Sequence, residues 1–315
     1  ELRIVEPHFD RYAKYSEMVR EIYAEYTDLC EPFGIDESWL DITNCLACPD
    51  PRRTADEIRR RVKNETGLTV SVGVSWNKVL AKLGSDYKKP DAVTVIDREH
   101  FRSMVWGLPA SDMLMVGRST RLELARMGIQ TIGELARTDP ELLRLRFGKG
   151  GTVLWRYANG LDDSRVRRAG EEEPPQSVGN SVTLARNIET ERQARETLLM
   201  LAESVSARLR RQKLRCRTVE VALRSEELKW TTHRMRLRYA TDVTVSLSAF
   251  GLELVHADED EQIDIFIDYV NLNKQRSIDA AVDGIRAKYG AESIQRACLL
   301  GDPAAANLAF CSLPD

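Results

Sequence analysis

Along the first fifty residues, the spacing of apolar positions changes from helical to strand-like. Residues 11–26 place apolar side chains on one side of a helix. Two short runs, 28–35 and 38–43, then predict strands joined by a tight turn. Two adjacent carboxylates, Asp36 and Glu37, lie at or beside that turn. The pattern therefore predicts an acidic pair at the edge of a sheet.

The next fifty residues alternate between helix and strand. A capping box from Thr54 to Glu57 predicts a helix that ends near Gly67. Residues 68–75 alternate valines with smaller side chains, as a strand does, and residues 92–96 predict a further strand. With a helix between these two strands, the order is α-β-β-α-β-α-β, which predicts an α/β layer.

The helix between the last two strands leads into a lysine-rich turn. Ser75 or Asn77 can cap this helix, and Lys89 stands immediately before a proline that fixes the turn. Carboxylates such as Asp36 and Glu37 hold divalent metal ions, and lysines receive phosphates. Phosphoryl transfer to a 3′-hydroxyl uses two such divalent ions. Together the groups indicate nucleotidyl transfer, whereas the acidic pair alone is better explained as two solvated turn residues.

Residues 108 to about 161 read as short helices punctuated by glycine. Within them, residues 114–136 have the form of a helix-hairpin-helix, with Val116–Ser119 as the hairpin. Gly117 lets backbone amides face a phosphate at a helix N-terminus. Such an element binds a duplex backbone without reading its sequence. The alternative is a glycine-terminated pair of helices that binds no ligand.

Beyond these helices, the polar stretch 167–175 ends in two prolines and predicts a linker. The pattern then returns to α/β, and a capping box at Thr190 opens a long amphipathic helix. The other predicted elements are strands over 177–184, 218–225 and 234–240 and a helix over 277–289.

The net charge of −3 conceals an asymmetry along the 315 residues. Net charge is −3 over residues 1–107, +4 over 108–168, +5 over 176–256 and −6 over 257–315. An acidic part followed by two basic parts is expected of a protein that grips a polyanion around a metal site, although scattered surface charge is the simpler alternative. The length is enough for two or three domains.

Cysteine usage and hydropathy bear on location. Six cysteines are few for this length, which suits a reducing compartment. No apolar run approaches the length of a membrane span, and the N-terminus shows no signal peptide. We therefore expect a cytoplasmic protein without a membrane partner. Cys45 and Cys48 lack a second cysteine pair or a suitably spaced histidine, and we interpret them as incidental. The peptide 262–266 is either a strand or loop edge or a partner-docking peptide.

The sequences FGIDESWLD at 33–41 and SVGVSWNKVLAKLGSDYKKP at 71–90 resemble the paired signatures of the Y-family, or translesion, DNA polymerases of the DinB/UmuC type. Residues 116–136 look like the thumb of these enzymes, and residues 176–186 look like the entry strand of their little finger. The resemblance covers nearly all of the chain and implies an α+β multidomain fold. The first part would be a partial palm over 1–107, built as a mixed sheet with helices. A small all-α helix-hairpin-helix thumb over 108–166, a linker over 167–176 and an α/β little finger over 177–315 would follow.

The resemblance also implies roles for single residues. Asp36 and Glu37 would be ligands of Mg²⁺, with Glu37 also catalytic, and Lys89 would meet the triphosphate of an incoming deoxynucleoside triphosphate. Two sets of residues would hold primer–template DNA: Gly117, Arg118, Ser119 and Thr120 in the thumb, and Ser177, Arg186, Arg234, Arg236 and Arg238 in the little finger. Gln262, Ile265 and Phe266 would belong to a peptide that binds the replicative sliding clamp.

The resemblance is incomplete on its N-terminal side. Family members begin with a palm strand that carries another metal-binding aspartate, followed by an aromatic sugar gate and the fingers, and none of these precedes the thumb here. We expect that a preceding segment is missing from this sequence, and that these 315 residues do not polymerise DNA on their own because one metal-binding aspartate is absent. The implied activity is error-prone translesion DNA synthesis. The alternative is a non-catalytic DNA-binding relative, or a polymerase fragment, that recruits the clamp.

Overall fold

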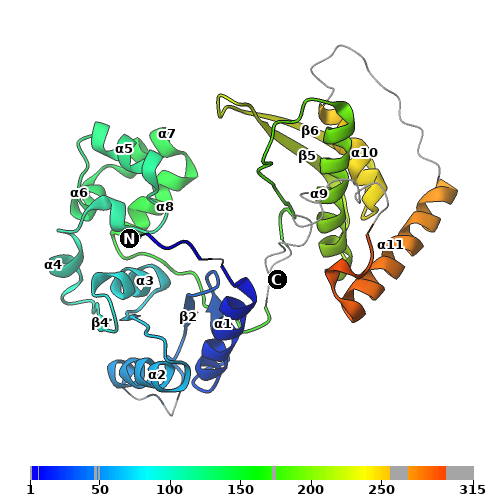
Figure 1. Cartoon of the computed structure of the whole chain (residues 1–315). Helices are drawn as coiled ribbons and strands as arrows, with labels where there is room; N and C mark the ends of the chain where they lie inside the picture. The colour runs from blue at the N-terminus through cyan, green and yellow to red at the C-terminus, as the bar shows by residue number, and fades with distance from the viewer. Residues whose placement is uncertain are drawn as a thin grey trace. The chain divides into compact units, whose positions relative to one another are not determined.

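The computed structural model describes residues 2–295 apart from residues 6, 46, 47, 49, 172–174 and 256–268. The chain divides into two compact units, and Figure 1 labels many of their helices and strands. The division falls between residues 173 and 174, inside the stretch 167–176 that the sequence predicts as a linker.

The first unit opens with the predicted order of elements (Figure 1). They are α1 (Phe9–Ala24), β1 (Cys30–Pro32), β2 (Ser38–Leu40), α2 (Pro51–Thr66), β3 (Val72–Val74), α3 (Lys78–Tyr87) and β4 (Val93–Val95). β1 and β2 pair antiparallel as the predicted hairpin, whereas β3 and β4 pair parallel. Where one mixed sheet is expected, the described strands of this unit form two separate pairs.

The start of α2 differs from its prediction. Asp50 caps the helix by accepting from the N–H groups of Arg52 and Arg53, and Pro51 occupies the first helical position. Proline suits that position because its missing N–H has no helical partner there. The capping box predicted at Thr54 is therefore wrong, and Thr54 lies inside the first turns of α2.

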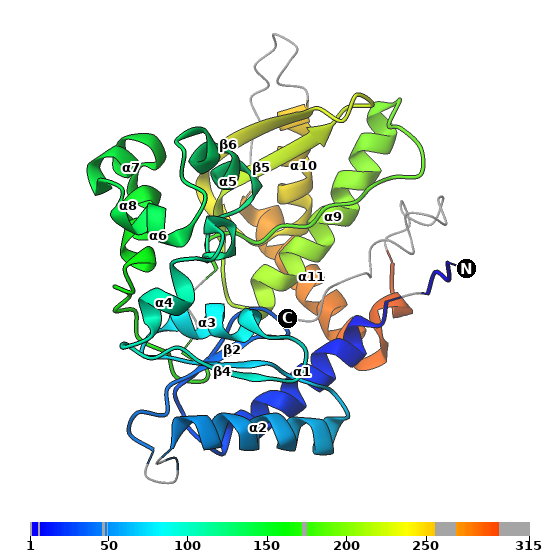
Figure 2. The ribbon, with the colours of Figure 1, turned by 90° about the vertical axis from the view of Figure 1, so that its left-hand side faces the viewer.

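The two helices α2 and α3 lie on opposite sides of the β3–β4 pair, as Figures 1 and 2 show. The contact between β3 and α3 depends on Gly73, because a Cβ there would lie 1.9 Å from the backbone oxygen of Ala81 and 2.5 Å from the backbone nitrogen of Ser85. Asn77, one of the two predicted caps, accepts from the N–H of Leu80 and starts α3. This close approach fixes α3 against the sheet.

Short helices complete the first unit. They are α4 (Phe101–Val105), the 3₁₀ turn η1 (Ala110–Asp112), α5 (Arg118–Arg126), α6 (Ile132–Arg137), α7 (Pro140–Phe147) and α8 (Lys149–Ala158). The predicted capping box at Thr131 is present at the start of α6. Leu80 of α3, Leu124 of α5 and Leu143 of α7 belong to one buried apolar cluster. The α/β layer and the short helices therefore share a core, which explains why they form a single compact unit.

The second unit packs helices on a β-hairpin. Its elements are α9 (Glu191–Arg211), β5 (Cys216–Arg224), β6 (Trp230–Thr241), α10 (Thr244–Val255), α11 (Tyr269–Tyr289) and the 3₁₀ turn η3 (Ala291–Ser293). The capping box predicted at Thr190 is confirmed. The strand predicted over 177–184 is wrong, because β5 and β6 pair with each other and the segment lies mostly exposed outside their ladder. Helix α10 was not predicted.

None of the helices in the described part of the chain combines the length and the apolarity that crossing a lipid bilayer requires.

Candidate active site

The turn between β1 and β2 carries the two predicted metal-binding carboxylates. Pro32 pairs with Ser38 across the hairpin, and the N–H of Phe33 donates to the carbonyl oxygen of Glu37 over 2.8 Å. Asp36 is exposed and Glu37 is half-buried. The sequence therefore correctly places both acids in a hairpin turn, where their side chains can reach a ligand from solvent.

Glu37 is joined to Lys89 by a line of ion pairs along α3. The Nζ atom of Lys82 lies 3.0 Å from the carboxylate of Glu37 and 2.6 Å from that of Asp86. Asp86 in turn lies 2.7 Å from the Nζ atom of Lys89, which is 57% exposed. The structure thus brings the predicted catalytic acid and the predicted triphosphate-binding lysine into one site.

Opposite charges hold this site together. Burial alone would lower the pKa of the Lys82 amine, but hydrogen bonds to Asp86 and Glu37 outweigh burial and raise that pKa. Burial alone would raise the pKa of Asp86, but hydrogen bonds from Lys82 and Lys89 outweigh it and lower that pKa. Both side chains are therefore charged at neutral pH.

Asp36 and Glu37 fit Mg²⁺ by the chemistry of their donor atoms. Mg²⁺ is a hard cation that takes one or two protein carboxylates together with substrate phosphates and water. The described residues contain no group of three or more His, Cys, Asp or Glu side chains that could hold a metal ion. The described part of the chain therefore offers the pair of carboxylates, and phosphate oxygens and water would supply further ligands.

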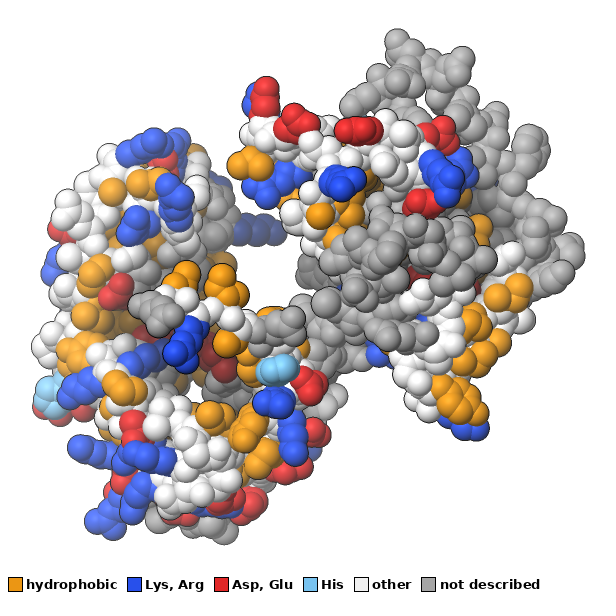
Figure 3. Space-filling model, viewed as in Figure 1, with side chains coloured by type: hydrophobic (Ala, Val, Ile, Leu, Met, Phe, Trp, Pro, Cys, Tyr) orange, Lys and Arg blue, Asp and Glu red, His pale blue; other side chains and the backbone are white. Residues whose placement is uncertain are grey.

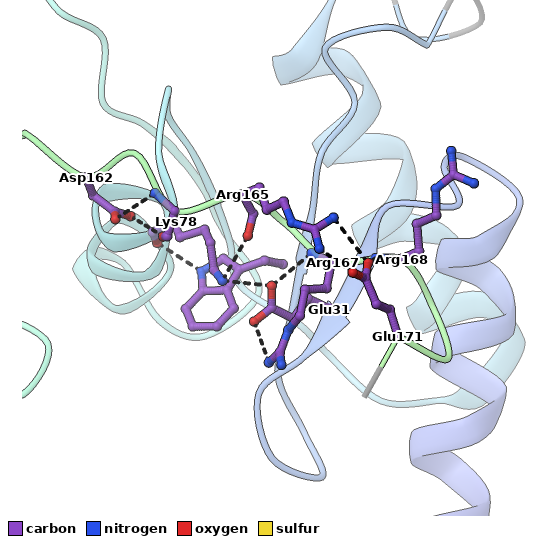
Figure 4. Close-up of polar contacts among 9 residues, drawn as sticks. Glu31, Lys78, Asp162, Arg165, Arg167, Arg168 and Glu171 are labelled. Atoms are coloured by element: carbon purple, nitrogen blue, oxygen red, sulfur yellow. Dashed lines mark hydrogen bonds and ion pairs between the residues drawn. The ribbon is translucent and has the colours of Figure 1, made fainter. Parts of the chain in front are cut away.

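Sequence reasoning missed a buried acid at the base of the same hairpin. Glu31 on β1 is 5% exposed, and its carboxylate forms ion pairs with Lys78 and Arg167 (Figure 4). The available signal was an acid between apolar residues in the middle of the predicted strand 28–35, shortly before Asp36. An acid in a strand gives no indication of its partners, because these come from distant parts of the chain.

Acidic pH should lower the unfolding free energy of the first unit through the ion pairs of Glu31. Burial alone would raise the pKa of Glu31, but hydrogen bonds from Lys78 and Arg167 outweigh it and lower that pKa below its ordinary 4.5. A carboxyl with a lowered folded-state pKa adds stability that is complete above its unfolded pKa and is lost as pH falls through its folded pKa. Between about pH 6 and about pH 3, we expect urea unfolding to show a steeper loss of unfolding free energy for wild type than for Glu31→Gln. Equal slopes of unfolding free energy against pH in wild type and Glu31→Gln would contradict this expectation.

Two helices of the first unit begin at glycines without a side-chain cap. Gly117 precedes α5 and Gly148 precedes α8. Uncapped N–H groups at a helix start attract phosphate. Arg118 and Ser119 are exposed and Thr120 is half-buried, so the predicted hairpin is accessible. The φ angle is +60° at Gly148, a backbone conformation that glycine adopts far more readily than other residues. At Gly117 it is −76°, which any residue can adopt.

The glycine at the start of α8 was also missed from the sequence. The signal is the stretch Gly148-Lys-Gly-Gly151, in which Lys149 is exposed. A Cβ at Gly151 would lie 2.1 Å from the backbone oxygen of Leu143, so α7 and α8 approach closely here. Figure 3 shows Lys and Arg side chains on the face of the short helices that is turned to the viewer.

Strand β6 of the second unit presents a row of arginines on one face. Arg234, Arg236 and Arg238 are exposed and alternate with inward side chains such as the buried Leu237. Period-2 alternation therefore aligns the three guanidinium groups on the outer face of the hairpin. Arg234 forms an ion pair with Glu220 on β5, which neutralises one end of the row.

The other predicted contacts of this unit fall in two places. Ser177 and Arg186 are exposed in the segment that precedes α9. Gln262, Ile265 and Phe266 lie outside the described residues, so the structure does not test the clamp-binding peptide.

Cys45 and Cys48 come together in the structure. Their Sγ atoms are 2.8 Å apart, and Cys48 is buried. No third metal-ligating group joins them among the described residues. The pair is therefore a thiol–thiol contact and gives no indication of a metal centre.

Sequence comparison matches both units. The sequence model of the impB/mucB/samB family covers residues 1–86, and that of the family's C-terminal domain covers residues 175–277. A DNA polymerase IV from Acetivibrio thermocellus is 40% identical over 323 residues, which cover 96% of this chain and 81% of the relative. The chain belongs to this family of DinB-type Y-family polymerases. DNA polymerase IV 2 of Bacillus subtilis is 32% identical to it and spans 94% of this chain and 78% of the relative.

The fold agrees with the Y-family assignment. A chimera of the Y-family DNA polymerases Dbh and Dpo4 matches this chain with a TM-score of 0.69 at 20% identity, covering 81% of this chain and 73% of the chimera. At that identity the likeness concerns the fold alone. The predicted resemblance and a partial polymerase fold are confirmed, whereas the roles of single residues stay predictions.

Proposed function

We propose that this Y-family chain is a DNA-directed DNA polymerase that synthesises DNA across damaged template. The observation that supports the proposal is the line of ion pairs from Glu37 through Lys82 and Asp86 to Lys89, which links an acid of the type that binds Mg²⁺ to a cation of the type that binds a triphosphate. The substrates are primer–template DNA and deoxynucleoside triphosphates.

The acids and the lysines have different tasks in this proposal. Asp36 and Glu37 would hold Mg²⁺. When bound, Mg²⁺ would neutralise the negative charge of the phosphates and lower the pKa of the primer 3′-hydroxyl. Lys89 leaves its surface ion pair with Asp86 to contact the triphosphate, a small cost because exposed pairs contribute little. Lys82 stays beside Glu37 and keeps its carboxylate oriented.

Binding of the duplex would use groups that meet phosphates without reading bases. The uncapped N–H groups at Gly117 and Gly148, together with Arg118, supply this in the first unit. Arg236 and Arg238 supply it in the second unit, where they lie exposed on β6. Sequence-independent contacts suit an enzyme that must accept any template.

Primer extension tests the proposal. The purified full-length protein, given Mg²⁺, all four deoxynucleoside triphosphates and a primer–template with a defined lesion, should give products extended past the lesion. Salt-sensitive duplex binding that is indifferent to nucleotide, with no extension, would favour the non-catalytic DNA-binding alternative. In either case, a clamp pull-down that survives replacement of Gln262 and Phe266 by Ala would exclude the proposed clamp-binding peptide.

Lys89 should act on nucleotide binding alone. For Lys89→Met we expect the KM for deoxynucleoside triphosphate to rise about tenfold, because one charge-assisted phosphate contact is lost. The affinity for primer–template DNA should stay unchanged. Steady-state single-nucleotide incorporation measures both. Lys88→Met is the matched control, since Lys88 is the exposed neighbouring lysine; an equal effect of the two changes would show only a general loss of positive charge.

A further inference from the structure

A buried carboxylate lies at the base of the hairpin that carries the metal-binding acids. Glu31 is 5% exposed, and its Oε2 atom lies 2.7 Å from the Nζ atom of Lys78 and accepts from the backbone N–H of Arg167 over 3.0 Å. Its Oε1 atom lies 2.9 Å from the guanidinium group of Arg167. We call Glu31, Lys78 and Arg167 the Glu31 anchor. Figure 4 shows the three side chains converging from separate segments.

The Glu31 anchor joins three segments that are far apart in the sequence. Glu31 belongs to β1, Lys78 is the first residue of α3, and Arg167 belongs to the segment that returns from α8. That returning segment is also held by the N–H of Ala169, which donates to the carbonyl oxygen of Asp28 over 3.1 Å. A single carboxylate therefore fixes where the hairpin, the lysine helix and the returning segment meet.

Lys78 also holds the second strand of the hairpin. Its ammonium group lies 4.5 Å from the centre of the Trp39 ring, and the Trp39 Nε1–H donates to the Lys78 carbonyl oxygen over 2.9 Å. Trp39 packs in turn on Phe33, with ring centroids 4.7 Å apart, at the edge of the turn. Both strands of the hairpin are thus held by the first residue of α3.

One helical turn further along α3, Lys82 forms its ion pair with Glu37. Successive turns of α3 therefore bind the hairpin at Glu31 and at Glu37. The position of Glu37 relative to α3 then depends on the buried pair, since the pair of Lys82 with Glu37 is more exposed and holds less firmly.

We propose that Glu31 is a positioning residue for nucleotidyl transfer, which sets the hairpin against α3 so that Asp36 and Glu37 face the lysines of that helix. The proposal rests on the proposed function. Glu31 touches neither substrate nor metal ion in this scheme and acts through the placement of Glu37. Removal of its charge leaves Lys78 and Arg167 without their shared counter-ion, and the base of the hairpin loosens.

Glu31→Gln tests the proposal because it keeps the shape of the side chain and removes its charge. Measured on the folded fraction, kcat for primer extension should fall about tenfold or more, while the KM for nucleotide and the Kd for primer–template DNA change less than about twofold. Glu31→Asp, which keeps the charge, should recover part of the lost kcat. Lys78→Met should lower kcat similarly, and the double variant should be no slower than the slower single variant.

The matched control is Asp28→Asn. Asp28 pairs with Arg168 of the same returning segment at 3.4 Å, but both side chains are 70% exposed, so its loss should leave kcat unchanged. An unchanged kcat in folded Glu31→Gln would overturn the proposal. An equal fall in kcat in Asp28→Asn would also overturn the proposal, because it would show that kcat depends on the returning segment as a whole and not on Glu31.

Hydrogen exchange separates this proposal from the proposed function. The N–H of Phe33 is bonded to Glu37 across the turn, and its exchange should accelerate at least about tenfold in Glu31→Gln but not in Asp28→Asn. If the wild-type chain fails to extend primers, the proposed function fails while this measurement still tests the placement of the hairpin. Unchanged exchange at Phe33 would overturn the positioning role.

Discussion

Glu37→Ala should reduce primer extension by about a thousandfold or more, with the duplex still bound. The carboxylate of Glu37 is one of the adjacent pair suited to Mg²⁺, and its loss removes charge from the place where the phosphoryl group reacts. The change also removes one of the two counter-charges of Lys82, which keeps its pair with Asp86, and so makes the place where a metal ion should bind more positive. Both effects act on the chemical step, so kcat should fall far more than duplex affinity.

The control for this prediction is Glu65→Ala. Glu65 forms a surface ion pair with Arg61 on α2, and its removal should leave extension within about twofold of wild type. Duplex affinity, measured by fluorescence anisotropy, should stay within about twofold of wild type in both variants. Normal extension by Glu37→Ala would show that the hairpin acids do not carry the reaction.

Gly73→Ala should lower the unfolding free energy of the first unit by about 3 kcal/mol or more. The added Cβ would lie 1.9 Å from the Ala81 oxygen, 2.5 Å from the Ser85 nitrogen and 2.8 Å from the Gly84 carbon. All three are backbone atoms, so no flexible side chain can move aside. To accept the methyl group, α3 must shift away from β3, which also displaces Lys82 from Glu37.

Thermal and urea unfolding measure this effect. For a unit of this size the destabilisation corresponds to a fall in Tm of about 6–12 °C. Gly107→Ala is the matched control, because nothing lies within 4 Å of a Cβ at Gly107, and it should change the stability by less than about 0.5 kcal/mol. A Tm for Gly73→Ala equal to that of wild type would mean that α3 lies further from β3 than the distances around Gly73 indicate.

The elements that were predicted well have causes that lie within a few neighbouring residues. The hairpin around Asp36, the cap at Asn77 and the capping boxes at Thr131 and Thr190 each depend on local spacing and local hydrogen bonds. The start of α2 is also locally determined, because Asp50 as the cap and Pro51 at the first helical position begin the helix four residues before Thr54.

The elements that were predicted wrongly depend on distant partners. Residues 177–184 have a strand-like pattern but do not join the β5–β6 ladder, so the backbone stays irregular. Helix α10 is rich in apolar and β-branched residues, which obscure a helical period, and packing against α9 and β5 decides its structure. Propensity is a weak guide wherever tertiary contacts supply most of the stabilising energy.

Local pattern and residue chemistry are enough to predict the order of elements in the first unit, the adjacent acids Asp36 and Glu37 in a hairpin turn and the lysine before a proline. The pairs of Asp86 with Lys82 and Lys89 are local, at spacings of four and three residues, whereas the pair of Lys82 with Glu37 forms only when the hairpin packs on α3. Folding likewise brings Glu31 to Arg167, a residue 136 positions away. Such pairs form because burial of a carboxylate requires counter-charges, and folding determines which distant cations can reach it.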